Sequence, residues 1–108
     1  MPIFPVLQEQ LDRLKSMEQA YQEKLASLPR GSIREKMVNG RSYYYLMYRE
    51  GTKVKTQYLK LSEHGLEELR FQLAQRKRYE QILREIRRDC RLLKRVVRGG
   101  EEPGDRIP

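Results

Sequence analysis

Basic and aromatic side chains are interleaved in the middle of the chain, between residues 34 and 55. Lys and Arg side chains bind phosphate groups, while tyrosine rings stack on bases or donate hydrogen bonds to phosphates. The pattern therefore predicts a surface that binds nucleic acid. The candidate contact residues in this segment are Arg34, Lys36, Tyr43, Tyr45, Arg49, Lys53 and Lys55.

The charge of the chain is concentrated in two blocks. Of 108 residues, 35% are charged and the net charge is +8, yet residues 30–60 carry +6 and residues 76–98 carry +7. Basic blocks favour phosphate backbones and anionic surfaces as partners. The second block is either a solvated helix face or an arm that adds affinity without sequence preference. Its candidate phosphate contacts are Arg76, Lys77, Arg84 and Arg88.

Few residues could carry out catalysis. The chain has one His and one Cys, His64 and Cys90, and these stand 26 positions apart without metal-ligand spacing. Cys90 falls on an apolar helical stripe, where a buried thiol acts as a small hydrophobic residue. We therefore predict no enzyme activity, no metal and no cofactor.

Two helices and three strands are expected to position these residues. Leucines recur at heptad-like spacing over residues 6–28, which predicts a helix that ends before Pro29 and Gly31. Residues 32–61 change to an alternating pattern, with strands predicted over 32–38, 41–49 and 52–61. Asn39-Gly40 is a strong hairpin signal, because a type I′ turn needs positive φ at both central residues.

The loop between the second and third strands decides which side chains share a face. A three-residue loop over 49–51 places Lys53 and Lys55 beside Arg34 and the other candidate contacts. A two-residue loop would move both lysines to the opposite face. A further alternative is that the tyrosines pack under the helices, while the lysines only protect strand edges.

A long second helix is predicted over 63–97, capped by Ser62 and followed by a loose tail over 99–108. It would exceed the first helix by roughly 18 Å, at about 1.5 Å per residue. The excess apolar stripe needs a cover, so a homodimer is predicted, with a single domain over residues 1–98. The candidate residues of a partner or dimer interface are Leu83, Ile86, Cys90, Leu93 and Val97.

The expected fold class is α+β. Two long helices form an antiparallel coiled-coil-like pair that flanks a three-stranded antiparallel β-meander. No apolar run approaches the roughly 18–20 residues of a membrane span. Met1 to Pro5 lacks the basic and apolar regions of a signal peptide, so a cytoplasmic location and no membrane partner are predicted.

The meander carries a resemblance to known families. The segments Gly31-Ser-Ile, Asn39-Gly, Tyr43-Tyr-Tyr-Leu and Tyr48-Arg-Glu-Gly-Thr-Lys-Val-Lys resemble a family of short uncharacterised prokaryotic proteins. That resemblance implies a leading helix, a meander and a long charged trailing helix. It implies little about activity, because the function of the family is unassigned. More loosely, residues 31–59 are similar to the arm-type DNA-binding domain of tyrosine integrases. This similarity implies a sheet in the DNA major groove, with Arg34, Lys36, Tyr43, Tyr45, Lys53 and Lys55 on the groove side.

Two functions follow as hypotheses. The first is a small nucleic-acid-binding protein that uses the basic meander face, with DNA favoured over RNA. The second is a coiled-coil adaptor or inhibitor that binds another protein through the long helix, with a nucleic-acid enzyme as one candidate partner.

Overall fold

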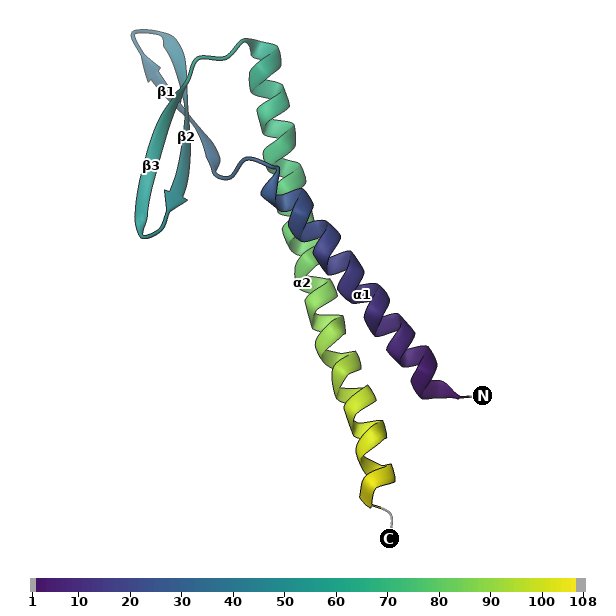
Figure 1. The fold of residues 1–108 in the computed structure, drawn as a ribbon. Coiled ribbons are helices and arrows are strands. Elements are labelled where there is room, and N and C mark those ends of the chain that lie inside the picture. Colours follow the sequence, from purple (N-terminus) through teal and green to yellow (C-terminus); the bar gives the residue numbers. More distant parts are fainter. Residues whose placement is uncertain (1, 107–108) are drawn as a thin grey trace. The chain divides into compact units, whose positions relative to one another are not determined.

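The computed structural model describes the backbone of residues 2–106 and the side chains of residues 2–99, and it has the predicted α+β class (Figure 1). The elements follow in the order α1 (Ile3–Ala26), β1 (Ser32–Val38), β2 (Arg41–Glu50), β3 (Lys53–Leu59) and α2 (Glu63–Arg106). They form two compact units. The helical unit joins α1, up to Leu25, to α2 from Tyr79 onward, and the sheet unit is Ala26–Arg78. The single domain predicted over residues 1–98 stays a prediction.

In the helical unit, α1 covers part of the apolar stripe of α2. Leu11, Ile86 and Cys90 are buried together, with 4–5% of each side chain exposed. Leu14 and Leu93 pack against this cluster and extend it. Full burial of an Ile or Leu side chain, as at Leu11 and Ile86, contributes about 1.5–3 kcal/mol. The antiparallel coiled-coil-like geometry predicted for the two helices stays a prediction.

A charged residue interrupts the apolar stripe of α1, and it has a partner on α2. Glu18 occupies a stripe position, and its Oε2 accepts a hydrogen bond of 3.0 Å from Nε of Arg87. Both side chains are partly exposed, so the ion pair contributes less than about 1 kcal/mol. Its main effect is to give the carboxylate a partner beside the buried cluster.

The thiol of Cys90 is expected to resist modification. Burial raises the pKa of Cys90, and the nearby Glu18 carboxylate raises it further, since both disfavour the thiolate. The folded state therefore keeps a proton that the unfolded thiol loses above about pH 8.5. The stability that this thiol contributes is present at lower pH and declines as the pH rises past that value.

We expect urea unfolding between about pH 7 and 9.5 to show this alkaline decline in the wild type and a shallower one in Cys90→Ala. Native protein should also react with a thiol reagent far more slowly than unfolded protein. Equal slopes in the two proteins, or rapid native labelling, would contradict the burial of Cys90.

The helix α2 extends further than predicted. It continues past Val97 and through Gly99 to Arg106, so the predicted helix end and the start of the loose tail are wrong at the level of the backbone. Glycine lowers helix stability by about 1 kcal/mol but keeps its backbone donor, so a glycine pair does not by itself end a helix. Residues 107–108 of the predicted tail lie outside the described residues. Among residues 2–106, neither helix combines the length and the apolar character that crossing a bilayer requires.

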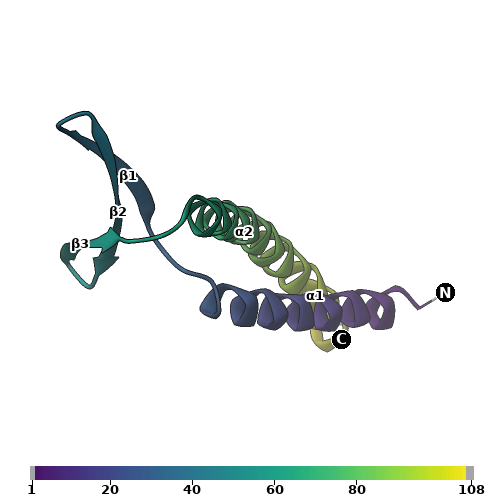
Figure 2. The same cartoon turned by 90° about the horizontal axis from the view of Figure 1, so that it is seen from above.

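The first hairpin of the sheet unit confirms the predicted register. Asn39 and Gly40 have φ values of 52° and 77°, as a type I′ turn requires. Ile33 therefore lies opposite Leu46, and Arg34 lies opposite Tyr45. The central strand is β2, with β1 and β3 on its two sides (Figures 1 and 2).

The second hairpin differs from the prediction. Its loop has two residues, Gly51 and Thr52, so Glu50 lies opposite Lys53 and Tyr45 lies opposite Tyr58. Gly51, with φ of 65°, supplies the positive φ that a two-residue loop needs at its first position. Because this loop is one residue shorter than the predicted one, the pairing of β3 with β2 shifts by one residue. Every side chain of β3 therefore lies on the face opposite to the one predicted.

The start of α2 confirms the predicted cap. The Ser62 hydroxyl accepts a hydrogen bond of 3.2 Å from the Gly65 amide, and the Leu66 amide donates to the Ser62 carbonyl at 2.9 Å. These contacts satisfy amide groups that the first turn of a helix leaves without partners. The helix therefore begins at a fixed point directly after β3.

Candidate nucleic-acid interface

The alternation of side chains divides the sheet into two faces. Cross-strand partners share a face, and neighbours along a strand lie on opposite faces. The tyrosine face carries Ser32, Arg34, Lys36, Val38, Arg41, Tyr43, Tyr45, Met47, Arg49, Val54, Thr56 and Tyr58. The leucine face carries Ile33, Glu35, Met37, Ser42, Tyr44, Leu46, Tyr48, Glu50, Lys53, Lys55, Gln57 and Leu59.

Three aromatic rings meet on the tyrosine face. The ring of Tyr58 on β3 neighbours both β2 rings of this face, with centroid distances of 6.3 Å to Tyr43 and 5.5 Å to Tyr45. Tyr58 is 51% exposed, and the other two rings are half-buried. The rings therefore form one continuous aromatic surface that water can reach.

Charge is separated between the two faces of the described sheet. The tyrosine face carries the cations Arg34, Lys36, Arg41 and Arg49, all of them exposed, and no carboxylate. Both acidic residues of the strands, Glu35 and Glu50, lie on the leucine face. The charged side chains of the tyrosine face are therefore all positive, and their electrostatic potential attracts anions.

Lys53 and Lys55 are not part of this surface. The two-residue loop places both lysines on the leucine face, where Nζ of Lys55 lies 2.9 Å from Oε2 of Glu50. Their predicted position beside Arg34 and Lys36 is therefore wrong. The physical reason is the two-residue Gly51-Thr52 loop, which shifts the pairing of β3 by one residue and so exchanges the two faces of that strand.

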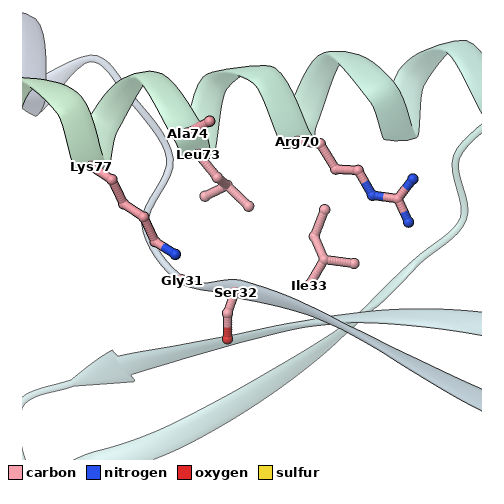
Figure 3. Close-up of a pocket in the computed structure, with 7 residues that line it drawn as sticks. All are labelled: Gly31, Ser32, Ile33, Arg70, Leu73, Ala74 and Lys77. Atoms are coloured by element: carbon pink, nitrogen blue, oxygen red, sulfur yellow. The ribbon is translucent and has the colours of Figure 1, made fainter.

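The leucine face is the side of the sheet that meets α2. Leu46 is 9% exposed, and the Arg70 guanidinium lies 5.6 Å from the centre of the Tyr44 ring. A pocket of about 340 Å³ lies between β1 and α2, lined by Gly31, Ser32, Ile33, Arg70, Leu73, Ala74 and Lys77. In Figure 3, Ile33 points toward the helix and Ser32 points away from it. Since the helix takes the leucine face, the tyrosine face stays open.

The candidates of the second basic block have different surroundings. Nη1 of Arg76 donates a hydrogen bond of 2.9 Å to the Leu28 carbonyl, and Lys77 lines the pocket on the leucine side. In the helical unit, Arg84 donates to Oε1 of Gln81 at 2.6 Å, and Arg88 is exposed. None of the four lies on the tyrosine face.

The predicted partner interface is largely buried inside the chain. Leu83, Ile86, Cys90 and Val97 are each 5–7% exposed, and Leu93 packs against the cluster that includes Leu11. A second copy is not needed to cover Ile86 and Cys90, because α1 already covers both residues. A homodimer stays a prediction without this support.

Two residues that contribute a charge or a ring to the tyrosine face, Arg41 and Tyr58, are absent from the predicted contacts. Tyr58 joins this face only with the two-residue loop, because the three-residue loop would place it on the leucine face. Arg41 directly follows the Asn39-Gly40 turn and lies two residues before Tyr43, so the two side chains share a face. The predicted first hairpin was therefore sufficient to place Arg41 on the tyrosine face. Among the residues that the structure describes, no three His, Cys, Asp or Glu side chains gather as a metal site would require.

Comparison with known proteins gives a family. Residues 6–70 match a family described as a domain of unknown function, DUF6788. The chain belongs to this family. The DUF6788 match includes the whole sheet and the first turns of α2, so the tyrosine face lies entirely within it. No curated protein matches the chain. No solved structure matches it either, so the looser similarity to the integrase domain has no support.

Proposed function

We propose that this DUF6788 protein binds nucleic acid through the tyrosine face of its sheet. The observation that carries the proposal is the separation of charge. Four exposed cations and three tyrosine rings share one open face, whereas both strand carboxylates lie on the other face. Phosphate contacts supply most of the affinity for a nucleic acid, and aromatic side chains add stacking or hydrogen bonds.

The burial pattern supports the same proposal. Every side chain of the tyrosine face is exposed or half-buried, including Val54, which is 55% exposed. An open face with apolar, aromatic and cationic side chains is typical of a binding surface. The proposed activity is binding alone, and it uses no cofactor.

A coiled-coil adaptor or inhibitor is the second candidate function. The observation that favours it is a pair of exposed apolar side chains one helical turn apart on α2, Leu92 and Val96, each just over half exposed. Because the predicted interface residues are largely buried, a protein partner would instead contact Leu92 and Val96.

The proposed function can be tested by the salt dependence of binding. Fluorescence anisotropy of labelled DNA and RNA oligonucleotides would be followed over a series of KCl concentrations. The wild type would be compared with a variant that carries Arg34→Ala, Lys36→Ala, Arg41→Ala and Arg49→Ala. If each cation contacts one phosphate, the slope of log Kd against log salt falls by about three. Absence of wild-type binding near physiological salt, or an unchanged slope in the variant, would overturn the proposal.

A further inference from the structure

Two cations of β1 and two rings of β2 form parallel rows on the tyrosine face. On β1, Arg34 lies directly opposite Tyr45, and Lys36 lies directly opposite Tyr43. On the other side of β2, Tyr58 lies directly opposite Tyr45. Tyr43 and Tyr45 therefore each have a cation directly opposite on β1. A nucleotide has the matching parts, a phosphate and a base.

The spacing of the tyrosines along β2 does not match the spacing of stacked bases. Two residues of one strand on the same face stand about 6.8 Å apart, since each residue adds about 3.4 Å. Stacked bases in a duplex stand about 3.4 Å apart along each strand. Two successive bases can each meet a tyrosine ring only if they separate from one another. An unpaired strand can do this at low cost, whereas a duplex must first lose pairing and stacking.

The side-chain chemistry of the face points the same way. Sheets that enter a major groove read base edges by hydrogen bonds from side chains such as Arg, Asn and Gln. The tyrosine face has arginines but no amide side chain, and its centre consists of the rings of Tyr43, Tyr45 and Tyr58. Rings offer flat surfaces for stacking, and a duplex interior offers them no free base.

We infer that the tyrosine face binds an unpaired nucleic-acid strand, with bases stacked on the tyrosines of β2 and β3 and phosphates held by the cations of β1. This inference rests on the proposed function and narrows its ligand. The shared ligand chemistry is a row of unpaired nucleotides, and both DNA and RNA single strands supply it.

The test compares single strands with a duplex. Labelled single-stranded RNA, single-stranded DNA of the same sequence, and the DNA duplex would be titrated with the wild type and with Tyr45→Leu, Tyr58→Leu and the matching Tyr→Phe variants. We expect at least one single strand to bind more tightly than the duplex. Each Leu variant should lose about 5-fold to 100-fold in affinity for it, and each Phe variant should stay close to the wild type. The salt slope should not change, because no cation is lost.

Other outcomes separate the inference from the proposed function. Circular dichroism would first establish that each variant has the wild-type fold. Duplex binding as tight as single-strand binding, with no effect of Tyr→Leu, would overturn the inference while leaving nucleic-acid binding intact. Equal losses in the Leu and Phe variants would also overturn it, because they would assign the effect to the hydroxyl groups. Failure of every oligonucleotide to bind would overturn the proposed function as well.

Discussion

Replacing Arg34 and Lys36 with alanine is expected to weaken nucleic-acid binding roughly ten-fold at moderate salt and to lower the salt slope by about 1.5 to 2. Replacing Lys53 and Lys55 instead is expected to change the affinity by about two-fold or less, because screening weakens charges that do not touch the ligand. Both variants lose two cations from the same sheet. They differ in the face that loses them.

This pair of variants separates a contact surface from net charge. A protein that attracts nucleic acid only through its overall charge of +8 would lose the same affinity in both variants. The measurement is the anisotropy titration over a salt series, with thermal melts to establish that both variants fold. Equal losses, or a larger loss in Lys53→Ala/Lys55→Ala, would contradict the role of the tyrosine face.

Gly31→Ala is expected to destabilise the sheet unit by about 2–4 kcal/mol. Gly31 has φ of 121°, which L side chains rarely adopt. A Cβ at this position would collide with the Met47 carbonyl oxygen and would stand 3.1 Å from Leu46 Cδ1. The site is tight because the chain enters β1 against the backbone of β2, where Leu46 is buried. The Met47 carbonyl cannot move away without disturbing the pairing of β1 with β2.

Gly40→Ala is the matched control. Gly40 also has positive φ, 77°, but no heavy atom lies within 4 Å of an added Cβ. Its substitution should cost only the backbone penalty, about 1–2 kcal/mol. The two variants can be compared by urea unfolding followed by circular dichroism. A loss in Gly31→Ala no larger than that in Gly40→Ala would contradict the close approach at the start of β1.

The two hairpins show how far local sequence determines a sheet. Asn39-Gly40 fits one turn type, so the register of β1 against β2 and the partners of Arg34 followed from the sequence. Gly51 fits either a two-residue or a three-residue loop, so the sequence does not determine which face each side chain of β3 takes. The structure has the two-residue form, in which Lys55 pairs with Glu50 and Tyr58 joins the two rings of β2. One loop residue thus removes Lys53 and Lys55 from the predicted site and adds Tyr58 to it.

Long-range packing was harder to predict. The structure confirms the apolar stripes and the Ser62 cap, because helical periodicity and capping are local signals in the sequence. No local pattern predicts the partners of Glu18 and Arg76, two charged residues that stand at positions of the apolar stripes of α1 and α2. Glu18 pairs with Arg87, and Arg76 donates to the Leu28 carbonyl, 48 positions away. Both contacts depend on how distant segments meet, which no local pattern encodes. The same applies to the cover that α1 gives to Ile86 and Cys90.

The seven tyrosines allow a direct test of the central claim within one sample. Tyr43, Tyr45 and Tyr58 lie on the tyrosine face, Tyr44 and Tyr48 lie on the leucine face, and Tyr21 and Tyr79 lie together in the helical unit. NMR spectra of the full chain with isotope-labelled tyrosine rings would be recorded while a single-stranded oligonucleotide is added. The account predicts that the ring signals of Tyr43, Tyr45 and Tyr58 shift, while the other four change little. Shifts confined to Tyr21 and Tyr79, or to Tyr44 and Tyr48, would contradict it.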